Sequence, residues 1–126
     1  MKKILLIACL AVCGCNSTPN VSQTASVMEI IQKAQEATDR DRYGLAIHYY
    51  SLLLDRFPYD RNAVCTAQYE IAFIHYKQKK YAVSKAEFEE LLRRYNERDS
   101  ELLPPEYKIL SEKGLKKINA KFKEAT

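Results

Sequence analysis

Apolar residues recur every three to four positions along most of the chain, which is the spacing of one face of an α-helix. Charged and polar side chains fill the positions between them, as expected for helices that bury one side and expose the other. No segment of any length alternates between apolar and polar residues with the period of two typical of a β-strand. The pattern therefore predicts an all-α fold of five helices joined by short connectors.

Capping residues and prolines set the expected ends of these helices. Ser26 and Glu29 have the spacing of a capping box, and Asp60 is suited to cap the third helix. Prolines at positions 104 and 105 suit the first turn of the fifth helix, where a missing N–H costs nothing. The expected helices span about 26–38, 43–56, 61–78, 80–95 and 104–123.

The first fifteen residues have the pattern of a bacterial secretory leader. Two lysines precede an apolar run from Ile4 to Cys13, which is shorter than the roughly 20 residues needed to span a bilayer. The Gly14–Cys15 pair that follows fits the end of a lipobox, so Cys15 is the expected lipidation site. Two alternatives stay open, since Cys13 follows a β-branched residue and Cys9 leaves a short apolar segment. An ordinary secreted or membrane-retained leader is a further alternative.

This leader divides the chain into three parts. Residues 1–14 form the expected signal peptide, residues 15–25 the lipidated cysteine and a polar tether, and residues 26–126 the helical domain. Removal of the 14-residue signal peptide leaves 112 residues, which suffice for one domain with a modest core. Without its two leader lysines, the formal net charge falls from +4 to +2.

The second and fourth helices repeat one sequence pattern at a distance of 38 residues. The stretch from Tyr43 to Phe57 aligns with the stretch from Tyr81 to Tyr95, and each copy has a small residue followed four positions later by an aromatic one. This is the second-helix signature of a tetratricopeptide repeat, although the usual period is about 34 residues. We expect two tetratricopeptide-repeat hairpins followed by a capping helix. The residues expected to pack the repeats are Tyr43, Ala46, Tyr50, Leu53, Pro58, Ala72, Tyr81, Ser84, Phe88 and Leu91.

Two repeats are fewer than the three that a stable stack normally needs. The segment 102–122 is therefore expected to close the second repeat, with Leu110, Leu115 and Ile118 covering its exposed end. The lysines and the glutamate on the other side of this helix would face water.

The sequence offers few residues for catalysis or metal binding. His48 and His75 lie in different expected helices, and neither has a cysteine or carboxylate at metal-ligand spacing. Cys65 lies in an apolar run and is expected to be a buried, inert thiol. Basic residues alternate with acidic ones, which argues against nucleic-acid binding. We therefore expect no catalytic residues, no metal, no cofactor, no nucleic acid and no small-molecule substrate.

Stacked helix pairs form a concave surface lined by the first helix of each pair, and such a surface commonly holds a peptide or a partner helix. Aromatic side chains suit this role because they give a large contact area at low entropic cost. The alternative is that the aromatic residues of the third helix pack inside the domain. The expected groove residues are Met28, Ile31, Gln35 and Thr38 in the first helix, and Thr66, Tyr69, Phe73, Tyr76 and Lys77 in the third.

Two motifs follow the lipobox and its tether. The first spans Tyr43–Pro58 and reads Tyr-x-x-Ala-Ile-x-x-Tyr-x-x-Leu-Leu-x-Arg-Phe-Pro; the second spans Ala67–Tyr81 and reads Ala-x-Tyr-x-Ile-Ala-x-x-x-Tyr-Lys-x-x-x-Tyr. Over roughly residues 15–96, the chain resembles the BamD family, the tetratricopeptide lipoproteins of the outer-membrane β-barrel assembly machinery. The resemblance implies a lipid anchor in the outer membrane, a domain in the periplasm, and two partners: a BamA-type insertase and unfolded outer-membrane proteins.

Two other functions fit the same residues, because repeat-packing positions report the fold rather than the partner. One is a pilotin-like or other envelope-coordinating tetratricopeptide lipoprotein. The other is a structural lipoprotein that associates with itself through an uncapped end of its short array.

Overall fold

The structure is a computed structural model that describes residues 19–124, and within this range it is all α-helical apart from turns and one 3-10 turn. The expected signal peptide and Cys15 lie outside the described residues. The five helices are α1 (Val27–Asp39), α2 (Tyr43–Arg56), α3 (Arg61–Lys77), α4 (Tyr81–Arg94) and α5 (Pro105–Glu124), with the 3-10 turn at Ser100–Leu102. The predicted helix boundaries are confirmed to within one or two residues.

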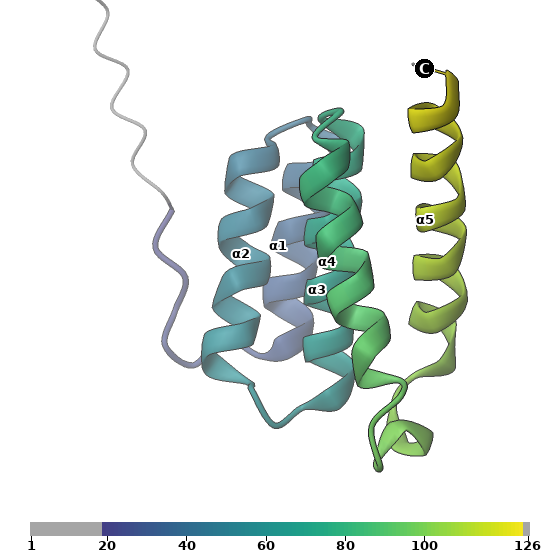
Figure 1. Ribbon diagram of the computed structural model, residues 1–126. Coiled ribbons are helices and arrows are strands. Elements are labelled where there is room, and N and C mark those ends of the chain that lie inside the picture. The colour runs from purple at the N-terminus through teal and green to yellow at the C-terminus, as the bar shows by residue number, and fades with distance from the viewer. Residues whose placement is uncertain (1–18, 125–126) are drawn as a thin grey trace, which may run out of the picture.

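The helices pack as sequential antiparallel pairs (Figure 1). α1 pairs with α2, α3 pairs with α4, and α2 also packs on α3 so that the two hairpins form one stack. α5 runs along α4 and also contacts α3. The α1–α2 and α3–α4 turns lie at one end of the stack, and the α2–α3 and α4–α5 connections lie at the opposite end (Figure 1).

Local hydrogen bonds explain where α1 and α3 begin. The Ser26 N–H donates to Glu29 Oε2 over 2.6 Å and the Glu29 N–H donates to Ser26 Oγ over 3.3 Å, which completes the predicted capping box. Asp60 Oδ1 accepts a hydrogen bond from the Ala63 N–H over 2.9 Å. Each cap satisfies a donor that a helix start would otherwise leave without a partner.

The two hairpin turns have the same backbone geometry, 38 residues apart. Asp41 and Lys79 both have positive φ, 55° and 61°, a conformation that few residues other than glycine adopt. After Asp41 the Arg42 N–H donates to the carbonyl five residues earlier, and after Lys79 the Lys80 N–H does the same, over 2.8 and 2.9 Å. The repeat found in the sequence is therefore also a repeat of turn conformation.

The predicted repeat-packing residues lie mostly in the core. Ala46, Tyr50 and Leu53 of α2 are fully buried, as are their counterparts Ser84, Phe88 and Leu91 of α4. Ala72 is also buried, Tyr43 and Tyr81 are half-buried, and Pro58 is exposed in the α2–α3 turn. Burial at the same three positions of both hairpins shows that α2 and α4 close onto their partners in the same way.

The packed part of the chain begins earlier than the sequence suggested. Val21 was expected in a polar tether, but it is only 5% exposed and belongs to the core formed by α1, α2 and α3. The Arg56 guanidinium donates to the carbonyls of Ser22 and Val21, over 2.7 and 3.3 Å. The tether prediction is therefore wrong for the residues from Val21 onward, because one apolar side chain and an arginine clamp hold them on α2.

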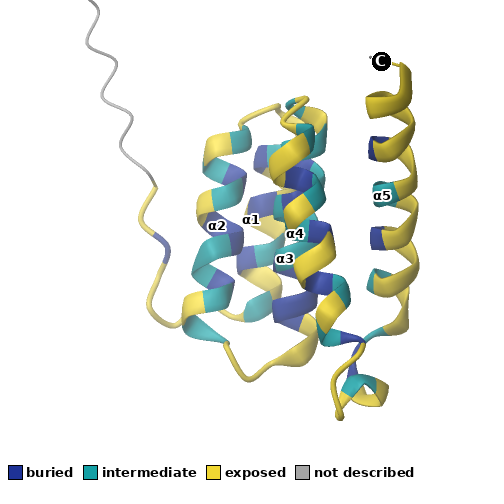
Figure 2. Ribbon diagram, viewed as in Figure 1, coloured by how far each residue is buried: buried dark blue, intermediate teal, exposed yellow. Residues whose placement is uncertain are grey.

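The predicted contact face of α5 is correct in part. Ile118 is buried and Leu115 is half-buried, but Leu110 is 37% exposed and does not cover the second hairpin. Buried positions lie on the side of α5 that faces α4 (Figure 2), and they include Ser111. A Cβ atom at Gly114 would lie 2.6 Å from a ring carbon of Phe88, so glycine allows α5 to approach α4 closely at this point.

No helix within the described residues is long and apolar enough to cross a membrane.

Candidate functional site

Aromatic rings on α3 form a continuous row that links this helix to its neighbours. The Tyr69 ring lies 5.9 Å from Phe73, 5.7 Å from Phe88 of α4 and 5.6 Å from Tyr107 of α5, measured between centroids. Tyr76 continues the row, stacking on Phe73 at 6.1 Å with a 12° interplanar angle. The Tyr76 ring also lies 5.6 Å, between centroids, from the ring of Tyr81, the first residue of α4.

These contacts decide between the groove and the core interpretations for Tyr69 and Tyr76. Both residues are half-buried, and their rings pack against other helices. They therefore contribute mainly to the packing of α3 against α4 and α5. Phe73 is also half-buried and packs beside the cluster of Ala72, Phe88 and Ile118. Tyr69 and Tyr76 therefore lie chiefly within the interior packing, with one part of each ring left at the surface.

Thr66 is not a groove residue, and this prediction was wrong. Its side chain is 8% exposed, and Thr66 Oγ1 is hydrogen-bonded to the Tyr107 hydroxyl over 2.7 Å. The Thr66 hydroxyl also donates to the Asn62 carbonyl one turn earlier, over 2.8 Å. The first turn of α5 packs over Thr66, and the sequence pattern did not predict this contact between α5 and α3.

The predicted groove positions of α1 are more exposed than those of α3. Met28 is 70% exposed and Gln35 is exposed, whereas Ile31 and Thr38 are half-buried. Ile31 packs against the core shared with α2. α1 packs mainly on α2, and the ring contacts described above link α3 to α4 and α5 instead.

One side of α3 nevertheless combines charge with an aromatic surface. Glu70, Phe73 and Lys77 follow one another at spacings of three and four residues, so they share one side of the helix, which we call the Glu70 face. The Lys77 ammonium lies 5.7 Å from the centroid of the Phe73 ring and 5.9 Å from that of Tyr43. Both distances are typical of a cation–π contact.

Glu70 is the residue of this face that the sequence analysis missed. It is half-buried, and burial raises the pKa of its carboxyl, while the positive charge of Lys77 partly opposes the rise. Within residues 19–124 the Glu70 carboxylate has no hydrogen bond and no ion pair. Its charge also contributes to the raised pKa of Tyr69 and Tyr107, after the larger effect of burial. A half-buried carboxylate without a hydrogen-bonding partner is suited to receive a cationic group from another molecule.

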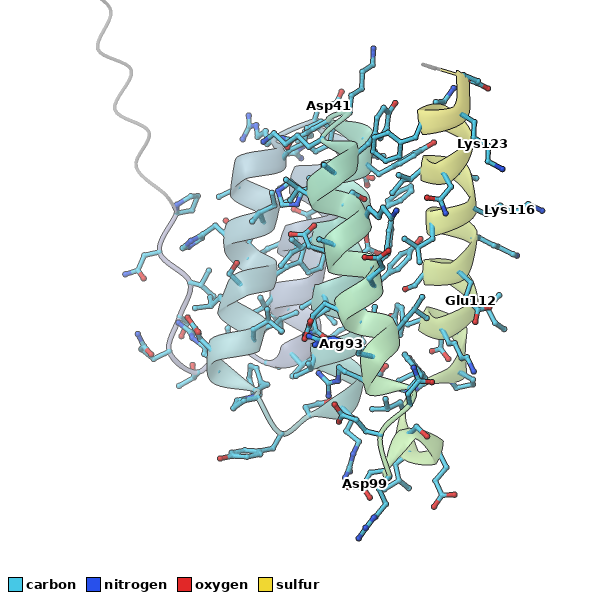
Figure 3. The ribbon with its side chains drawn as sticks, viewed as in Figure 1. Asp41, Arg93, Asp99, Glu112, Lys116 and Lys123 are labelled. Atoms are coloured by element: carbon cyan, nitrogen blue, oxygen red, sulfur yellow. The ribbon has the colours of Figure 1, made fainter. Side chains whose placement is uncertain are left out.

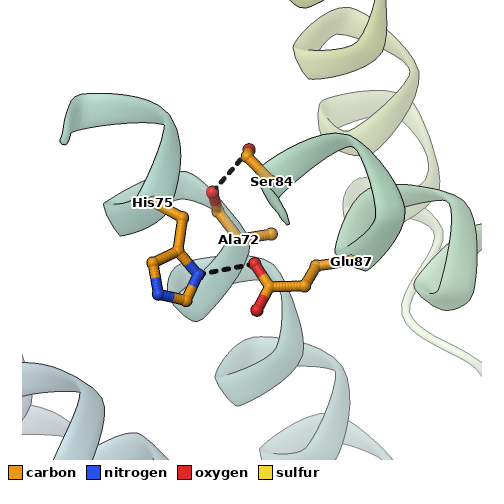
Figure 4. Close-up of polar contacts among 4 residues, drawn as sticks. All are labelled: Ala72, His75, Ser84 and Glu87. Atoms are coloured by element: carbon orange, nitrogen blue, oxygen red, sulfur yellow. Dashed lines mark hydrogen bonds and ion pairs between the residues drawn. The ribbon is translucent and has the colours of Figure 1, made fainter. Parts of the chain in front are cut away.

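The opposite side of α3 holds a histidine–carboxylate pair. His75 Nδ1 lies 2.7 Å from Glu87 Oε2 of α4 (Figure 4). Spacing within one helix gives no partner for His75, because Glu87 lies 12 residues away on the next helix. Beside the pair, Ser84 Oγ donates to the Ala72 carbonyl over 2.7 Å (Figure 4).

Glu87 also borders an apolar hollow between α2, α3 and α4. This hollow has a volume of about 630 Å³ and is lined mainly by aliphatic side chains. The aliphatic lining residues are Leu54, Ile71, Ala82, Val83 and Ala86. Within the described residues, no group of three or more histidine, cysteine, aspartate or glutamate side chains could hold a metal ion.

Cys65 is buried, as expected, and burial raises the pKa of its thiol. The Tyr95 hydroxyl lies 3.9 Å from the Cys65 sulfur and donates to the Pro104 carbonyl over 2.6 Å. A buried thiol with a raised pKa has little thiolate, so the arrangement is that of an unreactive packing residue.

Comparison with known proteins gives one relative of undefined role. The chain is 34% identical over 97 residues to an uncharacterized protein of Treponema pallidum (strain Nichols). The matched residues make up 75% of this chain and 39% of that protein, so this chain spans less than half the length of the relative. No family model and no solved structure matches the sequence.

Proposed function

We propose that this protein is a lipid-anchored, non-catalytic scaffold of the tetratricopeptide-repeat type that acts at the outer membrane in the assembly of β-barrel proteins. In this proposal Cys15 carries the lipid and the helical domain lies in the periplasm. The partners are a BamA-type insertase and unfolded outer-membrane proteins, as the resemblance to the BamD family implies.

The observation that carries this proposal is the repeated closure of the two helix pairs. A small residue, an aromatic residue and a leucine are buried at matching positions of α2 and α4, and the turns before these helices share one backbone conformation. Hairpins that close in this way stack into arrays, and such arrays act mainly by binding other proteins.

The Glu70 face is the surface we assign to the bound protein segment. Phe73 supplies an aromatic contact, Lys77 a positive charge and Glu70 a negative charge that lacks a partner in this chain. A segment with a basic side chain would neutralise Glu70, and its apolar side chains would cover Phe73. Affinity would then depend on charge as well as on apolar contact, so it would fall as the salt concentration rises.

An affinity pull-down tests the proposal. The tagged, full-length protein is isolated from detergent-solubilised envelopes, and its partners are identified by mass spectrometry. We expect a BamA-type insertase with the wild type and clearly less of it with Glu70→Lys, which replaces the unpaired negative charge by a positive one. Glu89→Lys is the matched control, because Glu89 is an exposed carboxylate on α4 outside the Glu70 face.

Each outcome of this experiment has a definite meaning. If the wild type recovers no insertase, the role in β-barrel assembly is wrong. Recovery of other envelope proteins in its place, with the same sensitivity to Glu70→Lys, would assign the Glu70 face to a different partner. Equal recovery with both variants would show that another surface binds the insertase.

A further inference from the structure

The segment before α1 fixes the point at which the chain leaves the domain. Val21 is buried in the core, and the Arg56 guanidinium holds the carbonyls of Val21 and Ser22. Val21 lies six positions after Cys15, and a chain of this length spans at most about 20 Å when fully extended. A lipid on Cys15 would therefore keep Val21 within roughly 20 Å of the membrane surface.

The two hollows that Pro19, the first described residue, borders show how the described chain runs before Val21. Pro19 borders a hollow along α2 together with Val21 and Arg56. It also borders a second hollow, lined among others by Arg40 and Arg42 of the α1–α2 turn. The chain thus passes from the clamp on α2 toward the end of the stack that holds the α1–α2 and α3–α4 turns (Figure 1).

The connections at the two ends of the stack differ in charge. The α1–α2 and α3–α4 turns hold two arginines, two lysines and one aspartate, a net charge of +3. The α2–α3 and α4–α5 connections hold two aspartates, two glutamates and one arginine, a net charge of −3. Figure 3 places Asp41, in the first of these turns, and Asp99, in the last connection, at opposite ends of the molecule.

The basic side chains of the first end are free to meet an external partner. Arg40, Arg42, Lys79 and Lys80 are all exposed, and none has a side-chain hydrogen bond or ion pair within residues 19–124. Asp41, the one aspartate in these two turns, accepts a hydrogen bond from the Tyr43 hydroxyl over 2.6 Å. We call these four side chains the basic end.

We propose that the basic end rests on the anionic phospholipid headgroups of the membrane in which the protein is anchored. The inference depends on the lipid anchor of the proposed function, but not on the identity of the protein partner. In this orientation the axes of the helices stand away from the membrane, and the end with the α2–α3 and α4–α5 connections points into the surrounding compartment. The lipid anchor keeps the domain near the membrane surface. The attraction of the basic end to the headgroups then favours one orientation of the domain among those that the short linker allows.

Fluorescence quenching in vesicles measures this orientation. The full-length lipidated protein is reconstituted into phosphatidylcholine vesicles with and without phosphatidylglycerol, and nitroxide-labelled headgroups serve as quenchers. A fluorophore is attached through Gly44→Cys near the basic end or through Tyr59→Cys at the other end. Gly44 has no atom within 4 Å of an added Cβ, and Tyr59 is 95% exposed, so both positions tolerate a label.

We expect stronger quenching at position 44 than at position 59 when phosphatidylglycerol is present. α2 alone is about 21 Å long, which separates the two labels by more than the reach of contact quenching. The difference should shrink at high salt and in pure phosphatidylcholine, because the attraction to the surface is electrostatic.

Charge reversal provides the specific test. A basic side chain close to an anionic surface favours the docked state by about fivefold, so losing two lowers the docked-to-free ratio about 25-fold, and reversing their charge lowers it further. The double substitution Arg40→Glu with Lys80→Glu should therefore abolish the preference for position 44. The matched control, Arg61→Glu with Arg98→Glu, makes the same change in charge at the opposite end of the stack and should retain the preference.

The outcomes separate this inference from the proposed function. Incorporation of radiolabelled palmitate that is lost in Cys15→Ser would support the anchor, and its absence would overturn both the anchor and this inference. Lipidation with equal quenching at both labels, or equal effects of the two charge-reversed variants, would overturn the orientation while leaving the scaffold function intact.

Discussion

The close approach of α5 to α4 gives a prediction whose sign the structure determines. Replacing a glycine inside a helix by alanine normally stabilises a protein by about 1 kcal/mol, because alanine favours the helical backbone. At Gly114, however, the new Cβ would lie 2.6, 2.8 and 3.1 Å from three ring carbons of Phe88, which is fully buried. Forcing an extra carbon into a packed core costs about 1–3 kcal/mol.

The cost exceeds the gain, so Gly114→Ala should lower the free energy of unfolding by about 1 kcal/mol. Gly44→Ala is the matched control, since nothing lies within 4 Å of its added Cβ. Gly44 is exposed near the start of α2, and its replacement should leave stability unchanged or raise it by about 0.5 kcal/mol. Urea denaturation followed by circular dichroism measures both variants, and a shift in midpoint at constant slope reports a change in stability.

A double substitution identifies the cause of the loss. Phe88→Leu removes the ring carbons that the new Cβ would meet, so Gly114→Ala should cost less in the Phe88→Leu background than in the wild type. The coupling between the two changes should be about 1 kcal/mol. A Gly114→Ala protein at least as stable as the wild type, or zero coupling, would refute the close packing of α5 on α4.

Three further results are expected. Ser84→Ala should cost about 1 kcal/mol in urea unfolding, because the hydrogen bond from Ser84 Oγ to a carbonyl of α3 is buried, and an unchanged midpoint would count against that bond. Burial raises the pKa of Glu70, so the folded state disfavours its ionised form, and this penalty is absent at low pH and grows as pH rises through the carboxyl's ordinary pKa. Glu70→Gln should therefore stabilise the protein at pH 7 and lose this advantage near pH 3, whereas an equal effect at both pH values would assign it to something other than ionisation. Arg56→Ala should accelerate amide hydrogen exchange between Val21 and α1, because two hydrogen bonds to this segment are lost, and unchanged exchange would mean that the apolar contact alone holds it.

Helix boundaries could be predicted because local side chains determine them. Ser26, Glu29 and Asp60 act within one turn of the residues they cap, so their spacing in the sequence is also their arrangement in space. The burial of Ala46 and Ser84 was predictable for a related reason. A small residue that recurs at the same place in two copies of a pattern marks a point where two helices must approach closely.

Contacts between different helices were harder to predict. The face of α5 that meets α4 includes Ser111 and Gly114, two residues that give no apolar signal in the sequence, while the apolar Leu110 is exposed. Hydrophobic periodicity therefore selected Leu115 and Ile118 correctly but wrongly added Leu110 to the contact face. The His75–Glu87 pair escaped notice because it depends on the relative rotation of α3 and α4, which the sequence of either helix does not specify.

The Glu70 face could be predicted only in part. The sequence pattern selected Phe73 and Lys77, which do lie close together, but it also selected Thr66, which α5 covers. Glu70 gave no signal, since a glutamate in a helix is ordinarily a solvated surface residue. Its distinctive state arises from burial beside tyrosines of α3 and α5, which becomes visible once the helices are packed.

The contrast between the two sides of α3 bears on where a partner would bind. On one side, the carboxylate of Glu87 pairs with His75, so it is not available to pair with a charged group of a ligand in the adjacent apolar hollow. On the other side, Glu70 has no partner within residues 19–124, and the Lys77 ammonium rests over aromatic rings instead of pairing with it. An apolar hollow binds many hydrophobic side chains with little specificity. An unpaired half-buried carboxylate, in contrast, binds positively charged groups preferentially. We therefore expect a specific partner to bind at the Glu70 face. A basic residue of that partner should determine the specificity of binding.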